Sequence, residues 1–264
     1  APAGANLPVA CMTASHVPRS APQAAATASH RMTADERRAS LSMAAIFALR
    51  MLGLFMVLPV FALEAAKLPG GNDPALIGLA MGVYGLTQAL MQVPLGLASD
   101  RFGRKKIIVL GLVVFALGSL LAALADSVQM LAVGRAVQGA GAISAAVTAL
   151  LADLTRDEVR TKGMALVGIS IGLTFALSLM AAPPLAGAIG LSGLFWLTAA
   201  LALIGIGVVL GITPAEPARH ADMPRGKLSD VWLHPQLWRL DLGVFVLHTV
   251  QMAMWGVVPA LLLQ

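Results

Sequence analysis

The stretch GLASDRFGRKK, residues 96–106, decides the fold, because it places five charged side chains between two long apolar runs. No Asp, Glu, Lys or Arg occurs in the run that leads into it, residues 75–98, or in the run that follows, residues 107–125. An α-helix of about 20 residues crosses the ~30 Å hydrocarbon core of a bilayer. The stretch is therefore predicted to be a short charged turn between two membrane-spanning helices.

The whole chain has the composition of a membrane protein. Of its 264 residues, 58% are apolar and 12% are charged, whereas soluble domains carry about 25% charged residues. Apolar runs of spanning length recur. We predict an all-α membrane protein with six complete transmembrane helices, residues 41–63, 75–98, 107–125, 128–152, 163–186 and 191–213.

The chain divides into four predicted segments. Residues 1–40, rich in Ala, Ser, Pro and Thr at their start, are expected to be a disordered N-terminal tail. Residues 41–213 form the six-helix domain, and residues 214–239 form a cytosolic loop. Residues 240–264 form a seventh helix that runs to the last residue of the sequence, so we expect the chain to be a fragment of a longer protein.

Basic residues are concentrated on one predicted side of the membrane. Lys67 is the only basic residue in the loops of one side, Arg50 and Arg135 lie within predicted spans, and all other Lys and Arg belong to the tail and the opposite loops. The positive-inside rule predicts a cytoplasmic N-terminus, in a bacterial inner membrane. This distribution indicates the lipid bilayer as partner rather than nucleic acid. The single cysteine, Cys11, can build no thiolate metal cluster, and we expect no metal.

Three residues of the charged turn have physical roles that follow from their types. Gly96 removes a side chain where two helices are expected to approach closely. Asp100 is predicted to end one helix and to face the N-terminus of the next, where the helix dipole favours a carboxylate. Gly103 permits a backbone conformation that other residues resist.

The order Gly-x-x-x-Asp-Arg-x-Gly-Arg-Lys within residues 96–105 resembles the loop 2–3 motif of the major facilitator superfamily. In the fourth predicted helix, LAVGRAVQGAGA resembles the Arg-x-x-Gln-Gly segment of this family, matched by Arg135, Gln138 and Gly139. The fifth helix contains MAAPPLAG, residues 180–187, which agrees in part with the Gly-Pro motif of the antiporter branch. The matching residues there are Pro183 and Gly187, while alanines replace two glycines.

Together with longer stretches between residues 41 and 210, these motifs look like the YajR-type drug–proton antiporters of the family. The resemblance implies the major facilitator fold of twelve helices in two halves, of which this chain supplies the N-terminal six-helix bundle and helix 7. It implies transport by alternating access, no cofactor, a proton gradient as driving force, a small-molecule substrate, and a monomer when full length. A transporter of this kind is not an enzyme.

The resemblance also implies a conformational latch at the charged turn. In that interpretation Asp100 pairs with Arg104 and with helix 11, which lies beyond this chain, and Asp153 joins the same charge network. An alternative is that Asp153 only caps a helix end. The residues assigned to the latch are Gly96, Asp100, Arg101, Gly103, Arg104, Lys105 and Asp153.

Arg135 and Arg50 are the charged residues that the sequence places inside the bilayer. A buried charge there costs several kcal/mol, about 2.5–3.5 on insertion scales, unless it is paired or hydrated. Arg135 is expected to face the cavity with Gln138 nearby, and the resemblance implies a part in proton coupling. Alternatively, Arg135 only holds helices together. The alternative for Arg50 is that its long side chain extends toward the cytosol.

Four further residues are candidate substrate contacts. Tyr84, Gln88 and Gln92 recur four residues apart and so share one helix face, which is expected to meet protein or the cavity. Hydrogen bonding between helices is an equally good explanation of that face. His248 lies in the seventh helix, and histidine is the side chain that commonly exchanges protons near neutral pH.

We therefore expect proton-coupled efflux of small amphipathic compounds. One alternative is a facilitator or symporter that imports a sugar, organic acid or other metabolite, which would share the same loop and arginine motifs. Another is a non-transporting membrane receptor or sensor, which would have no need for Arg50 and Arg135 in the bilayer.

Overall fold

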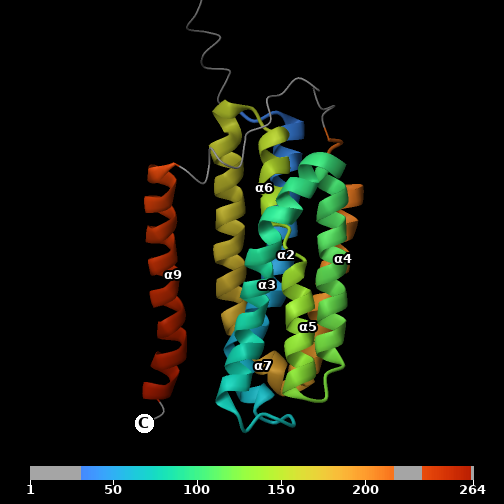
Figure 1. The fold of residues 1–264 in the computed structure, drawn as a ribbon. Coiled ribbons are helices and arrows are strands. Elements are labelled where there is room, and N and C mark those ends of the chain that lie inside the picture. Colours follow the sequence, from blue (N-terminus) through green and yellow to red (C-terminus); the bar gives the residue numbers. More distant parts are fainter. Residues whose placement is uncertain (1–30, 217–233, 263–264) are drawn as a thin grey trace, which may run out of the picture. The chain divides into compact units, whose positions relative to one another are not determined.

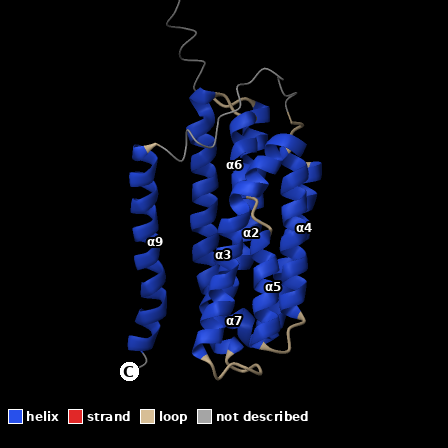
Figure 2. Ribbon diagram, in the orientation of Figure 1, coloured by secondary structure: helices blue, strands red, loops and turns tan. Residues whose placement is uncertain are grey.

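The chain folds into helices, as predicted. The computed structural model describes residues 31–216 and 234–262, and no strand occurs among these residues (Figures 1 and 2). The first unit contains α2 (Ala34–Ala65), α3 (Pro74–Phe102), α4 (Arg104–Ala123), α5 (Val128–Ala140), α6 (Ser144–Asp153) and α7 (Asp157–Gly211). The second unit holds α9 (Pro235–Leu262), the predicted seventh helix. Most of the predicted tail and of the 214–239 loop lies outside the described residues.

The first helix begins earlier than its apolar run. Thr33 caps α2: its side chain accepts a hydrogen bond from the amide of Glu36 at 3.2 Å, and the Glu36 carboxylate accepts from the Thr33 amide at 2.8 Å. This reciprocal pair satisfies two amides that a helix start leaves open. Residues 34–40, which were assigned to a disordered tail, are therefore helical. Likewise α9 begins at Pro235, five residues before the predicted helix.

The predicted fourth span is broken into α5 and α6. The helix stops at Gly141, and residues 141–143 are not helical. A Cβ added at Gly141 would lie 2.4 Å from the carbonyl oxygen of Gly111, so α4 and this segment are in backbone contact. We attribute the break to the Gly-Ala-Gly sequence and this close approach, since glycine has low helix propensity.

The predicted fifth and sixth spans are the two arms of α7. Gly190 divides them with a positive φ of 66°, a conformation that glycine adopts readily. Ser178, before the bend, donates to the Leu52 carbonyl, and Thr198, after it, donates to the Gly53 carbonyl. The two arms therefore pack beside the same turn of α2, and α7 is a hairpin.

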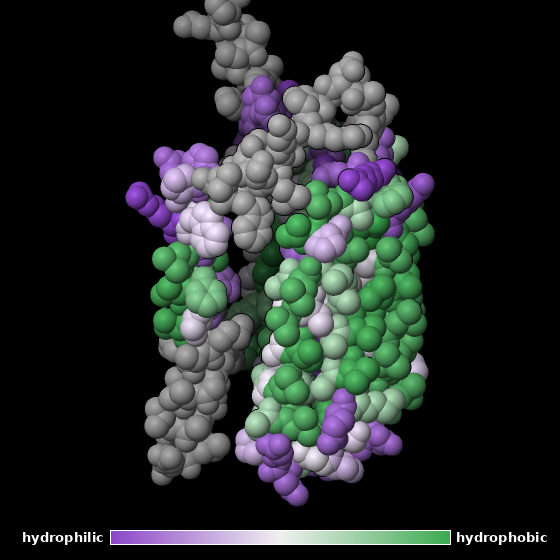
Figure 3. Space-filling view, viewed as in Figure 1, coloured by the Kyte–Doolittle hydropathy of each residue, from purple (hydrophilic) through white to green (hydrophobic). Residues whose placement is uncertain are grey.

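Charged side chains gather where α2 and α4 begin and where α3 and α6 end. Arg38 of α2 donates to the carbonyl of Ile212, just after α7, at 2.8 Å, and Arg156, just before α7, pairs with Glu36. We call this end, with the turn at Arg104, the charged end. Figure 3 shows hydrophilic residues at both ends of this unit and a hydrophobic band between them.

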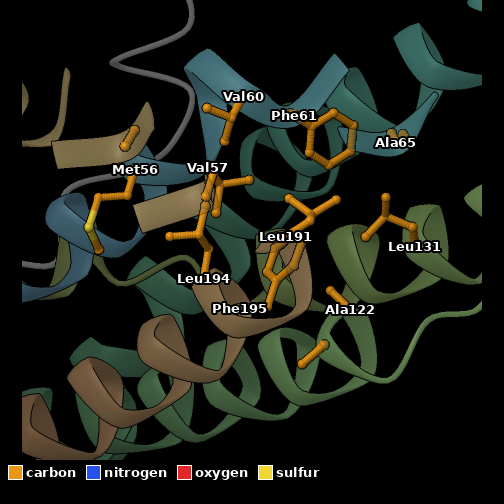
Figure 4. Packing of buried hydrophobic residues seen from close by; sticks show 14 of the residues in the cluster. Met56, Val57, Val60, Phe61, Ala65, Ala122, Leu131, Leu191, Leu194 and Phe195 are labelled. Carbon is orange, nitrogen blue, oxygen red and sulfur yellow. The ribbon is translucent and has the colours of Figure 1, made fainter. Parts of the chain in front are cut away.

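Within the part of the chain that the structure describes, five helical segments are long and apolar enough to cross a membrane, α5 and α6 counting as one segment and α7 as another. At 55 residues α7 is too long for a single crossing, which agrees with its hairpin. The largest buried cluster of the described residues joins α2, α4, α5 and α7, with Ala80 of α3, near the end opposite the charged end, around Val57, Phe61, Leu131, Leu194 and Phe195 (Figure 4). By contrast α3 buries only Ala80, Tyr84 and Ser99.

Candidate functional site

The charged turn ties three helix ends together. Arg104, the first residue of α4, forms ion pairs with Asp100 of α3 at 2.7 Å and with Asp153, the last residue of α6, at 2.5 Å. Arg104 also donates to the Ser99 hydroxyl at 3.2 Å. The predicted network of Asp100, Arg104 and Asp153 is thus present. Its effect is to bind α3, α4 and α6 at one point of the charged end.

The N-terminus of α4 is also held by the segment that follows α7. Gly103 has φ 107°, which confirms the need for glycine there. The Glu216 carboxylate accepts a hydrogen bond from the Lys105 amide, and the Lys105 ammonium donates to the carbonyl of Thr213 at 2.7 Å. Asp100 faces this helix start through its ion pair with Arg104, as expected. The segment after α7 supplies a second carboxylate there, where the helix dipole favours it.

Two residues of the motif have weaker roles than expected. A Cβ added at Gly96 would lie 3.5 Å from the Ala145 Cβ, an ordinary contact distance, so no close approach within the described residues requires glycine at this position. Arg101 is exposed and forms no ion pair within the described part of the chain.

A groove of about 360 Å³ opens beside the charged turn, between α3 and α6. Asp100, whose side chain is 55% exposed, and Arg104 line its charged end. Gln92 lies further along α3 and also lines the groove, and its buried side-chain oxygen has no hydrogen-bond partner among the described residues.

A second ion pair holds α2 to α7 at the charged end. The Arg156 guanidinium donates to the Glu36 carboxylate at 2.7 Å, and the Arg156 amide donates to it at 3.2 Å. Glu36 precedes the apolar run that begins at Leu41. The Arg156 side chain, aided by hydrogen bonds from the Thr33 and Arg156 amides, lowers the pKa of the Glu36 carboxyl from 4.5 to about 2.

Arg135 lies in the interior of the bundle with the glutamine that its motif predicts. Its side chain donates to the Gln138 oxygen at 2.6 Å, and the Gln138 amide donates to the Ser119 hydroxyl of α4 at 2.8 Å. Arg135 is 1% exposed, and Gln138 and Ser119 are fully buried. The spacing of three residues brings the first two onto one helix face, as expected.

Arg50 reaches the same place from α2. It is 1% exposed, and its guanidinium donates to the Tyr84 hydroxyl at 3.1 Å and to the Gln88 oxygen at 3.2 Å. The guanidinium of Arg135 lies 4.5 Å from the centre of the Tyr84 ring. Both arginines therefore meet on one tyrosine. Arg50 does not extend to the cytosol. On the predicted face of α3, Tyr84 and Gln88 meet protein, while Gln92 lines the groove.

Aromatic rings complete the surroundings of the two guanidiniums. The Arg50 guanidinium lies 5.1 Å from the centre of the Phe115 ring, and that of Arg135 lies 5.7 Å from the Phe61 ring. Contacts of this kind attract a cation to the ring face. We call Arg50, Tyr84, Gln88, Arg135 and Gln138, with these two phenylalanines and Ser119, the arginine network.

Gly139 allows the helices of the arginine network to meet. A Cβ added there would lie 2.2 Å from both the Thr87 hydroxyl and the Tyr84 carbonyl oxygen.

The third motif, MAAPPLAG at residues 180–187 of α7, packs differently from the family pattern. Pro183 and Gly187 lie on the exposed face of α7, while Ala182 and Ala186 are buried, so the residues that depart from the family motif are the ones that pack.

His248 belongs to the separate unit of α9. It is exposed, and its Nδ1 lies 2.9 Å from the carbonyl oxygen of Val244. Its assignment as a substrate contact stays a prediction.

Sequence reasoning missed Ser119, Phe61, Phe115 and Glu216. The first three look like ordinary residues of apolar helices, and Glu216 is separated from Lys105 by 111 residues. Only the fold brings them to the sites, so no local pattern could have found them.

A bundle of apolar helices with two buried arginines and a charged turn at one end defines a polytopic membrane protein. The model of the Major Facilitator Superfamily matches residues 43–264, and the chain belongs to this family. It is 47% identical over 234 residues to the inner membrane transport protein YajR of Escherichia coli (strain K12), covering 87% of this chain and 51% of YajR.

Other comparisons agree with the fold. Multidrug resistance protein 2 of Bacillus subtilis (strain 168) is 32% identical over 157 residues, which are 58% of this chain and 38% of that protein. The crystal structure of the POT family transporter PepTSo superimposes with a TM-score of 0.61 at 14% identity, covering 70% of this chain and 40% of that one. The chain thus spans about half the length of YajR.

Proposed function

We propose that the full-length protein is a secondary active transporter that exports small amphipathic compounds from a bacterial cell in exchange for protons. It lies in the inner membrane with a cytoplasmic N-terminus and works as a monomer by alternating access. Similarity to YajR and to a multidrug resistance protein supports transport and efflux, and the proton gradient is the driving force in this proposal.

The observation that carries the proposal is the cluster of Asp100, Arg104 and Asp153 at the charged end. It binds three helix ends into one body, and one of its carboxylates lies on an open groove. The proposal makes this groove the place where the other half docks in one state and separates in the other. Surface ion pairs contribute little to static stability, about 0–1 kcal/mol, so a role in switching explains the cluster better than a role in folding.

Arg135 takes part in proton coupling in this proposal. A buried positive charge favours the ionised form of any acid that comes near it. An acidic group that enters the arginine network in one state and leaves it in the other would release and take up a proton.

Proteoliposomes that hold the full-length protein and an internal pH-sensitive dye test the proposal. The compounds are tetraphenylphosphonium, naphthalene-1-acetamide and naphthalene-1-acetate. We expect at least one to produce a proton flux above that of protein-free liposomes, in the direction opposite to the movement of the compound. Movement of a compound without protons would indicate a facilitator. No movement of any compound would contradict transport.

A further inference from the structure

The arginine network contains two positive charges and no negative charge. All ion pairs that the described residues form lie at the ends of the helices, and neither Arg50 nor Arg135 belongs to one. The oxygens that accept from them, those of Tyr84, Gln88 and Gln138, are neutral. Buried charges in proteins are normally paired, so this pair of cations lacks its counter-charge.

Several donors in the network also lack an acceptor. Nε and Nη1 of Arg50 and Nε of Arg135 are buried and have no hydrogen-bond partner among the described residues. A guanidinium has five N–H groups in a fork that matches the two oxygens of a carboxylate. The N–H groups of the network that have no acceptor within the described part of the chain therefore suit an anion.

The rest of the network is aromatic. Phe61, Tyr84 and Phe115 lie against the two guanidiniums. A ligand that satisfies the whole network therefore needs an anionic group for the arginines and an apolar or aromatic body for the rings. A cationic compound would meet two uncompensated like charges at short range, which is unfavourable in a low-dielectric interior.

One face of α3 connects the groove at the charged end with this network. Gln92, Gln88 and Tyr84 lie four residues apart on one face of α3, which places Tyr84 about 12 Å from Gln92 along the helix. Gln92 lines the groove at the charged end, and the partly exposed Gln88 contacts Arg50. Because α2 packs chiefly on α7 and only sparsely on α3, the two helices can part here with little loss of packing.

We propose that Arg50 and Arg135 together recognise the anionic group of the transported compound, and that the substrates are aromatic or otherwise apolar organic anions such as aromatic carboxylates. This inference rests on the proposed function and names the substrate class of the same site. It makes Gln88 the first residue of the network that an entering anion meets.

The test measures binding, which does not depend on transport. Purified full-length protein in detergent is titrated with benzoate and with naphthalene-1-acetate, each beside its uncharged amide, by isothermal titration calorimetry. We expect both carboxylates to bind at least tenfold more tightly than their amides. If neither carboxylate binds, the proposal is overturned. This result would follow if a carboxylate elsewhere in the protein were paired with the two arginines. Displacement by equimolar chloride overturns the assignment to an organic anion.

Two isosteric variants supply the missing charge from within the chain. Gln138→Glu places a carboxylate beside Arg135, and Gln88→Glu places one beside Arg50. Each is expected to weaken binding of the carboxylates at least tenfold and to leave the thermal midpoint equal or higher. Carboxylate affinity equal to that of the wild type in both variants contradicts the proposal. Gln129→Glu, the same change at an exposed position of α5, is the control and should bind as the wild type does.

Failure of this inference and failure of the proposed function look different. Binding that Gln138→Glu weakens, without any proton flux in proteoliposomes, would refute proton-coupled transport but keep the anion site. Proton flux with tetraphenylphosphonium, together with no binding of the carboxylates, would keep transport and refute the anion site. Gln138→Glu gives up the hydrogen bond from the Gln138 amide to Ser119, whereas Gln88→Glu keeps an acceptor for Arg50. A selective loss of carboxylate binding in Gln88→Glu with an unchanged thermal midpoint is therefore not explained by misfolding.

Discussion

At the scale of single residues, Gly139 controls how closely α3 and α5 approach. Its missing side chain leaves room for the Tyr84 carbonyl oxygen and the Thr87 hydroxyl, each 2.2 Å from where a Cβ would be. Tyr84 is in turn the residue on which both buried arginines meet. The glycine of the Arg-x-x-Gln-Gly motif therefore positions the arginine network, although it contacts no ligand itself.

Gly139→Ala should destabilise the full-length protein. The added methyl group forces α3 and α5 apart, and overpacking of this kind costs about 1–3 kcal/mol. A lower midpoint in thermal unfolding of the detergent-solubilised protein would show it. Gly85→Ala, on α3 with nothing within 4 Å of the added Cβ, is the matched control and should leave the midpoint unchanged or raise it. Equal midpoints for the two variants would contradict this role of Gly139.

Residue-level predictions from the sequence succeeded where partners lie close in the chain. Arg135 and Gln138 contact each other because three residues bring them to one face of α5. Asp100 and Arg104, four residues apart, also pair. The close approach expected at Gly96 is not found among the described residues, since the side chain that faces it, Ala145, is small and leaves room for a Cβ. The sequence gives no distance between helices, so the need for glycine there could not be judged.

At the scale of elements, the pair of Glu36 and Arg156 fastens the start of α2 to the start of α7. The pKa of the Glu36 carboxyl is lowered from 4.5 to about 2 in the folded protein. Because the pKa is lowered on folding, the pair stabilises the fold fully at pH values above the pKa of the unfolded state. This stabilisation is lost as the pH falls toward the pKa of the folded state.

Glu36→Gln should therefore lower the thermal midpoint of the full-length protein at pH 7, and the difference from the wild type should shrink as the pH falls below about 4.5 toward about 2. Thermal unfolding at a series of pH values measures this difference. Asp35→Asn, at the exposed neighbouring position, is the control and should lower the midpoint at pH 7 less than Glu36→Gln does. A gap between wild type and Glu36→Gln that stays constant down to about pH 3 would refute the assignment.

Element boundaries show which physical signals the sequence carries. Apolar runs located every helix of the first unit, because hydropathy reports burial in lipid or protein directly. They missed residues 34–40, which are helical through the Thr33 cap rather than through apolarity. They also missed the break at residues 141–143, which depends on contact with the backbone of Gly111. The carboxylate of Glu216 at the start of α4 likewise depends on tertiary structure.

At the scale of the whole molecule, the described six-helix unit is about half of a transporter of this family. The side chains of α3 are mostly unburied in this unit, and the groove beside Asp100 opens along that helix. Alternating access needs contacts that form in one state and break in the other. Asp100 meets that requirement, because it is bound to Arg104 on one side and exposed on the other.

Asp100→Asn in the full-length protein should keep membrane insertion and thermal stability and lose most transport. Stability should be kept, because a half-exposed ion pair four residues apart contributes only about 0.3–0.5 kcal/mol. Transport should be lost, because the neutral amide can no longer hold Arg104 or a docked partner electrostatically. Proton flux in proteoliposomes, beside the amount of monodisperse protein recovered, separates the two effects.

The matched control is Asp157→Asn, which removes the same charge at the same end. Asp157 pairs with Arg160 at 2.6 Å, three residues apart, and its side chain is 84% exposed, outside the cluster of Arg104. If only the loss of a surface charge mattered, both variants would slow transport equally. If the cluster switches the two halves, only Asp100→Asn should slow transport. Wild-type proton flux in Asp100→Asn would remove the latch from the mechanism, while the family and the helical fold would be unaffected.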